Sequence, residues 1–138
     1  MTFEDLIKLK DYEISFEQIS ESKTKEVQLR IIVNISSNAT DLLIFPHADS
    51  KAETLQIDFK NYITYSVIYD DYTNWNDDEV FRGDSFRIYE KSKFFDFVQK
   101  EYRLPDYELT HYSLACIEHH VHIISKSPPV IKVIDPDE

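Results

Sequence analysis

Side chains that could ligate a metal or transfer protons gather near the C-terminus of the chain. Residues 111–122 hold four of the five histidines and the only cysteine: His111, Cys116, His119, His120 and His122. Imidazole and thiolate are the ligands that zinc prefers. Strand alternation would project His120 and His122 from one face, so these two are our candidate metal ligands.

The same stretch also has a purely structural interpretation. Tyr112, Leu114 and Cys116 share one strand face, and a tight turn over 118–121 would place Val121 and Ile123 on that face too. Cys116 would then face the core, away from the candidate ligands, and the spacing matches no standard two-plus-two zinc pattern. On this interpretation the histidines are exposed and titrate near neutral pH, and the thiol packs as a small hydrophobe.

A second candidate is the acidic loop 70–79, with the sequence D-D-Y-T-N-W-N-D-D-E. Aromatic residues of this kind anchor protein interfaces, and carboxylates steer a basic partner toward them. We therefore predict a partner-binding surface made by Asp70, Asp71, Tyr72, Trp75, Asp77, Asp78 and Glu79. The alternative is a merely solvated loop. An EF-hand does not fit, because counting back from Gly83 puts Val80 and Arg82 at ligand positions.

The sequence contains none of the common catalytic motifs, so it indicates no enzyme class. The chain has no G-x-S-x-G elbow, no P-loop and no G-x-G-x-x-G, and its single glycine cannot build the usual phosphate-binding loop. Cys116, predicted to lie in a core strand, lacks the electropositive, partly exposed setting of a nucleophile. We expect no cofactor, and a non-catalytic protein rather than an enzyme.

The charge balance restricts the partners. The 138 residues carry a net charge of −11, whereas nucleic acids and anionic membranes are bound by clustered Lys and Arg. A basic protein is the more natural partner. The lone cysteine excludes a disulfide-stapled scaffold, and the first residues lack the pattern of a secretory signal, so we expect a cytoplasmic protein.

The hydrophobic periodicity predicts one α+β domain over residues 1–138. Apolar residues alternate with polar ones in a series of short segments, which we interpret as seven to nine strands of a mostly antiparallel sheet, curled or folded into two layers. The segments are 12–19, 27–35, 55–59, 63–69, 86–88, the hairpin 111–122, and 130–134, with Leu42–Phe45 as a further short strand ended by Pro46. Residues 2–10 fit either a helical turn or a strand.

One main helix is predicted near 92–103. Ser92 is a suitable N-cap and Pro105 lies just beyond the end. A broad apolar arc, expected to pack on the sheet, comprises Phe94, Phe95, Phe97, Val98 and Tyr102.

Two runs of sequence carry a resemblance. F-R-G-D-S-F-R-I-Y-E-K-S-K-F-F-D-F-V and H-Y-S-L-A-C-I-E-H-H-V-H-I-I-S-K-S-P-P, within residues 81–129, resemble a group of small, uncharacterised acidic proteins from Bacillus-type bacteria. The resemblance is one of pattern, implies no activity and assigns no functional residue. In bulk properties the chain is also similar to immunity proteins that act against secreted toxins.

Two functional hypotheses follow from the sequence. The first is a non-catalytic protein-interaction module, of immunity or antitoxin type, that binds a basic partner through the acidic loop. The alternative is a small-ligand or metal-binding protein, or a minor enzyme, that uses the histidine-rich hairpin 111–122.

Overall fold

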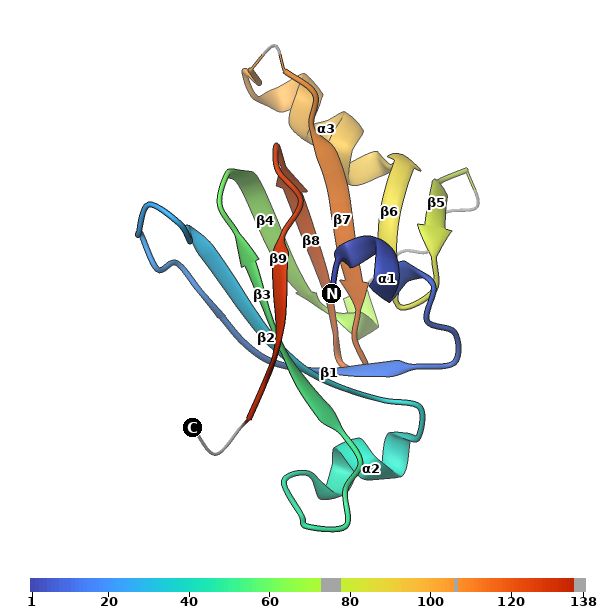
Figure 1. Cartoon of the computed structure of the whole chain (residues 1–138). Coiled ribbons are helices and arrows are strands. Elements are labelled where there is room, and N and C mark those ends of the chain that lie inside the picture. The colour runs from blue at the N-terminus through green and yellow to red at the C-terminus, as the bar shows by residue number, and fades with distance from the viewer. Residues whose placement is uncertain (73–77, 106, 136–138) are drawn as a thin grey trace.

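The computed structural model describes residues 1–72, 78–105 and 107–135, and its strands form two antiparallel sheets (Figure 1). The first sheet has the order β1-β2-β3-β9, with β1 (Glu13–Ser20), β2 (Leu29–Ser36), β3 (Glu53–Phe59) and β9 (Val130–Ile134). The second has the order β4-β8-β7-β6-β5, with β4 (Tyr62–Tyr69), β8 (His119–Ser125), β7 (Thr110–Ala115), β6 (Phe86–Lys91) and β5 (Val80–Gly83). The predicted α+β fold with a two-layer antiparallel arrangement is confirmed.

The core lies between the two sheets, and the inner strands contribute alternate apolar residues to it. In β2 the alternate residues Leu29, Ile31 and Val33 are fully buried, and β2 is paired on both sides, as expected for the most clearly alternating segment. From the second sheet, Tyr112 reaches across and its ring lies edge-on to Phe59, with ring centroids 5.5 Å apart. Edge-to-face pairs of this kind add to the free energy of burial.

The N-terminal residues form a helix that closes one side of this core. In α1 (Phe3–Ile7) Thr2 and Asp5 make a reciprocal capping box, which satisfies two amides of the first turn. Phe3 and Leu6 are buried, and the Phe3 ring packs edge-on against Tyr112 at a centroid distance of 5.0 Å. This settles a segment that sequence pattern left open between helix and strand.

The predicted strand at Leu42–Phe45 is wrong, because this segment lies in the helix α2 (Ala39–Ile44) and its C-cap, Phe45. The Asn38 side chain accepts a hydrogen bond from the Thr40 amide and caps the helix. A strand at this point would also have had no ladder on β2, whose two sides are already paired with β1 and β3. Local capping therefore outweighs the apolar run.

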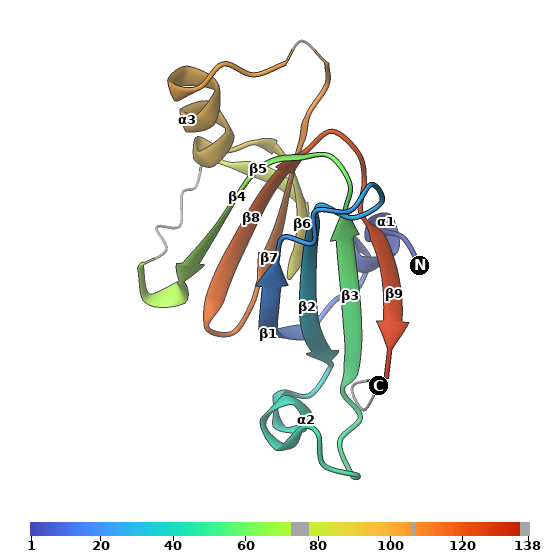
Figure 2. The same cartoon turned by 90° about the vertical axis from the view of Figure 1, so that its left-hand side faces the viewer.

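The helix near 92–103 is confirmed as α3 (Lys93–Glu101), and Ser92 is its N-cap, with Oγ accepting from the Phe95 amide at 3.1 Å. Its predicted packing is only partly right. Val98 is buried, but Phe97 is 55% exposed and Tyr102 62% exposed. Figures 1 and 2 show why: α3 lies beyond the end of β6 and β7 instead of across the sheet.

Two smaller differences concern strand ends. β5 escaped notice because all four of its residues are exposed and show no alternation. The turn of the β7–β8 hairpin spans Cys116–His119, with the Cys116 amide donating to the His119 carbonyl, and not 118–121. The displacement is an even number of residues, so Tyr112, Leu114 and Val121 still share the core-facing side, as predicted.

Candidate protein-interaction surface

The N-terminal part of the acidic loop is exposed at the end of the edge strand β4. After β4, a short 3₁₀ helix, η1 (Asp70–Tyr72), presents Tyr72 with 75% of its surface exposed. Asp71 is exposed, and Asp70 is half-buried, with its amide donating to the Glu118 carbonyl at 2.8 Å. Trp75 and Asp77 lie outside the described residues, so their assignment to a binding surface stays a prediction.

The C-terminal part of the acidic loop contacts the N-terminus of α3 in the same molecule. Glu79 Oε2 accepts a hydrogen bond from the Lys93 amide at 2.9 Å, and Asp78 Oδ2 lies 3.4 Å from Lys93 Nζ. A carboxylate in this place satisfies an amide of the first turn of α3 and interacts favourably with the helix dipole. The structure thus gives Asp78 and Glu79 contacts with α3, and leaves Asp71 and Tyr72 without such contacts among the described residues.

Around Tyr72 an apolar surface continues across both sheets. Tyr69, on β4, is 46% exposed, and the centroid of its ring lies 5.4 Å from that of His119. The His119 ring also packs against the Phe16 ring of β1, at a centroid distance of 5.0 Å. Beyond Phe16 lies α2, whose Leu43 is 82% exposed. The surface therefore runs from η1 through the β7–β8 turn and the start of β1 to α2, in the half of the molecule that lies away from α3 (Figure 2).

We call this region the acidic apolar end and define it by residues 13–17 of β1, the connection 37–50 that contains α2, residues 66–72 at the end of β4 and in η1, and the turn 116–119. These segments contain no Lys and no Arg. They contain seven carboxylates: Glu13, Glu17, Asp41, Asp49, Asp70, Asp71 and Glu118. Clustered charge of one sign beside exposed aromatics is complementary to a basic surface that also carries apolar side chains.

Sequence reasoning missed the larger part of this surface. Phe16, Leu43, Ile117 and His119 were assigned to strands or to the histidine hairpin, and only the fold brings them together, with His119 against Tyr69. One signal was present in the chain: four separate segments that lack every basic residue although Lys and Arg number 15 overall. Without the topology, nothing in the sequence indicates that these segments meet.

Three histidines of the 111–122 hairpin, His111, His120 and His122, form a second cluster, on the outer face of the second sheet. His111 and His120 are each only 2% exposed, which corrects our alternative interpretation of exposed histidines. Ser92 Oγ lies 2.7 Å from His111 Nδ1, and His111 Nε2 lies 2.9 Å from His122 Nδ1. Ser113 Oγ lies 3.1 Å from His120 Nε2, so each ring has a hydrogen-bond partner within the cluster.

This environment keeps the imidazoles neutral. Burial, together with the neighbouring His122 and His120, lowers the pKa of His111 to about 2. Burial and the charges of His122 and Arg87 lower the pKa of His120 to about 3, and burial with Arg87 lowers that of His122 to about 4. Among the described residues, no group of three or more His, Cys, Asp or Glu side chains is arranged to hold a metal ion, so metal binding by His120 and His122 stays a prediction.

Cys116 occupies the place expected of a packed thiol. It is 5% exposed, and burial raises its pKa to about 12, so it stays protonated at neutral pH. A protonated, enclosed thiol is a poor nucleophile.

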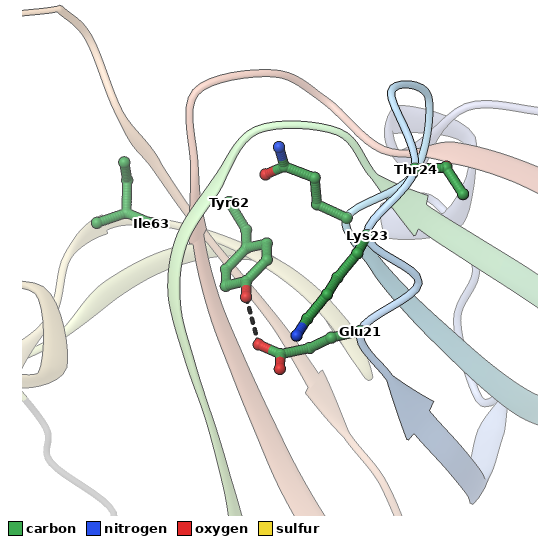
Figure 3. A pocket seen from close by; sticks show the side chains of 6 residues that line it. Glu21, Lys23, Thr24, Tyr62 and Ile63 are labelled. Carbon is green, nitrogen blue, oxygen red and sulfur yellow. Dashed lines mark hydrogen bonds between the residues drawn. The ribbon is translucent and has the colours of Figure 1, made fainter.

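A polar pocket of about 410 Å³ lies between the β1–β2 connection and the start of β4 (Figure 3). The Tyr62 hydroxyl donates a hydrogen bond to Glu21, and this bond, with burial, raises the Tyr62 pKa to about 12. Lys23, Thr24 and Gln28 complete its polar lining. The carboxylate of this pocket is thus already engaged by the phenol.

Comparisons of the chain with protein-family models, with curated proteins and with solved structures found no match. Within residues 1–72, 78–105 and 107–135, no helix is long and apolar enough to cross a membrane.

Proposed function

We propose that this protein is a non-catalytic interaction module that binds a basic protein partner through the acidic apolar end. The observation that carries the proposal is the combination found there: seven carboxylates, no Lys or Arg, and the exposed rings of Tyr72 and Tyr69 on one continuous surface. Tyrosine is among the residue types that dominate binding energies at protein interfaces.

The two kinds of side chain would contribute differently. Exposed carboxylates such as Asp71 accelerate encounter with a basic partner, an effect that salt screens over a Debye length of about 8 Å at physiological ionic strength. Tyr72 would act by burial, and truncating such a residue typically costs about 2 kcal/mol or more, mainly through faster dissociation. Association should therefore slow as salt rises, whereas Tyr72→Ala should mostly accelerate release.

The other titratable groups support a binding rather than a catalytic role. The clustered histidines have pKa values far below neutrality and are hydrogen-bonded within the cluster, and the Cys116 thiol is protonated and enclosed. General bases and nucleophiles need pKa values near the working pH and access to substrate. Neither property is found at these residues.

The immunity or antitoxin form of the proposal has a specific test. If a gene beside that of this protein encodes a basic, toxin-like product, co-production of the wild-type protein should relieve its toxicity and form a complex with it. Tyr72→Ala should weaken both effects.

A direct test compares affinity capture by the wild type, by Tyr72→Ala and by Tyr102→Ala. Tyr102 is 62% exposed at the opposite end, so it is a matched control. We expect a basic protein that is captured by the wild type and by Tyr102→Ala and is reduced with Tyr72→Ala. Captured proteins that are acidic, or that are retained equally by all three, would overturn the proposal.

A further inference from the structure

We propose that the pocket between α2, β1 and the β7–β8 turn receives an apolar side chain of the basic partner, presented on an amphipathic segment with Lys and Arg on either side of it. This inference rests on the proposed function and names the partner's chemistry. It joins two features of the same surface, a small pocket lined by apolar and polar side chains and the charge around it.

The cavity has the size and lining of an anchor site. Its volume is about 140 Å³, and its walls are Ser15, Phe16, Leu42, Leu43, Ile117, Glu118 and His119. A cavity of about 150 Å³ lined by Leu, Ile and Phe is large enough for benzene, so this one accommodates a group such as the end of a Leu, Met or Phe side chain. Residues that dominate binding energies at interfaces typically fill well-packed, desolvated pockets.

The walls of the pocket are held by main-chain and side-chain hydrogen bonds. The Ile117 amide donates to the Ile14 carbonyl at 2.8 Å, which fixes the turn against β1. On the other side, Asp41 Oδ2 accepts from Ser36 Oγ at 3.1 Å and the Asp41 carbonyl accepts from Ser50 Oγ at 2.7 Å. A site whose walls are fixed before binding loses little conformational entropy when it is filled.

The apolar rim of the pocket is left exposed by the fold. None of the residues of α2 is buried, Leu43 is 82% exposed, and Ile44 and Ile117 are 42% and 45% exposed. Removing apolar surface from water is worth roughly 25 cal/mol per Å², so covering these side chains would favour a complex.

The negative charge around the pocket determines which kind of molecule can bind there. A second copy of this chain would bring another seven carboxylates against the first seven, and like charges facing each other across an interface are unfavourable. An anionic lipid surface would be repelled for the same reason. A segment with apolar anchors at helical spacing and basic residues between them satisfies both the pocket and the charge.

The experiment uses three synthetic amphipathic peptides and measures dissociation constants by fluorescence anisotropy. The first peptide has Leu at i, i+3, i+4 and i+7 with Lys and Arg at the other positions. The second replaces each Leu by Ser at the same net charge, and the third replaces Lys and Arg by Glu. The protein variants are Leu43→Ser and the control Phe97→Ser, whose target is 55% exposed on α3.

We expect the Leu peptide to bind at least about tenfold more tightly than the Ser peptide, and Leu43→Ser, but not Phe97→Ser, to reduce that advantage. Amide resonances of Phe16, Ile117 and His119 should shift on binding, whereas those of His111 should not. Equal affinity for the Leu and Ser peptides would overturn the anchor while leaving the charge-based function standing. Equal binding of the Glu peptide, or no binding of either basic peptide, would overturn both.

Discussion

Acidification by little more than one pH unit below neutrality should strongly destabilise this protein. The perturbation acts on His111, His120 and His122, whose folded-state pKa values are about 2, 3 and 4, against 6.5 for an unperturbed histidine. At a pH between about 4 and 6.5, the three histidines bind protons in the unfolded chain and stay neutral in the folded chain. Stability is therefore fully present above about pH 6.5 and falls as the pH decreases.

The size of the loss of unfolding free energy follows from the three histidines of the cluster. Each histidine contributes a loss of about 1.4 kcal/mol per pH unit below 6.5, so the cluster contributes on the order of 4 kcal/mol at pH 5.5. Domains are typically stable by about 5–15 kcal/mol, so this is a large fraction of the total. Glu4 and Asp5 have pKa values lowered from the ordinary 4.5 and 3.8, so both carboxylates titrate below pH 5.5 and add little to this effect.

Urea unfolding at pH 7.5, 6.5 and 5.5 measures the effect as the slope of the unfolding free energy against pH. His122→Gln, which keeps a hydrogen-bonding side chain, should reduce the slope by about 1.4 kcal/mol per pH unit. The matched control is His47→Gln, because the His47 side chain is 60% exposed beyond α2. A wild-type slope near zero over this range, or equal effects of the two variants, would refute the buried, neutral cluster.

Three further predictions concern single positions. Gly83→Ala should lower the unfolding free energy in urea by about 1–3 kcal/mol or more, because Gly83 has φ +100° and an added Cβ would lie 2.0 Å from the Phe86 carbonyl oxygen; an unchanged free energy would contradict the turn geometry. The native Cys116 thiol should react with a disulfide reagent at pH 8 about a thousandfold more slowly than in the urea-unfolded chain, because a pKa of about 12 in place of 9.0 leaves that much less thiolate. Purified protein analysed for metals should contain no stoichiometric zinc; zinc that is lost on combined His120→Ala and His122→Ala substitution would instead favour the metal-binding alternative.

The sequence alone was sufficient to predict an element where the hydrophobic periodicity is regular or a helix cap supports it. The alternation in β2 and β3, and Ser92 followed by the apolar residues of α3, fix those elements locally. It was insufficient at Leu42–Phe45, where apolar residues on both faces suggested a strand and the Asn38 cap, together with the fully paired β2, produced a helix. Periodicity reports which side of an element is apolar, and it does not report what the other side meets.

The candidate site shows the same limit. Tyr72 and Asp71 could be singled out as exposed because they follow an alternating strand, and the structure confirms their exposure. Leu43 and Ile117 could not, because their place beside Phe16 depends on the connection of β2 to β3 and on the position of the β7–β8 turn. The histidines were expected to be exposed because they lie on the face opposite the core. That face carries a buried cluster of its own, to which α3 contributes Phe94.

The unequal distribution of charge along the molecule gives it an electric dipole moment. Figures 1 and 2 place α2 at one end and α3 at the other. Residues 78–103, which contain α3 and the two carboxylates that contact it, carry six Lys and Arg and six carboxylates, whereas the acidic apolar end carries seven carboxylates and no Lys or Arg. A positively charged partner would therefore exert a torque on the protein as well as an attraction, and would turn the acidic apolar end toward itself before the surfaces touch. Fewer random encounters are then lost to the wrong orientation.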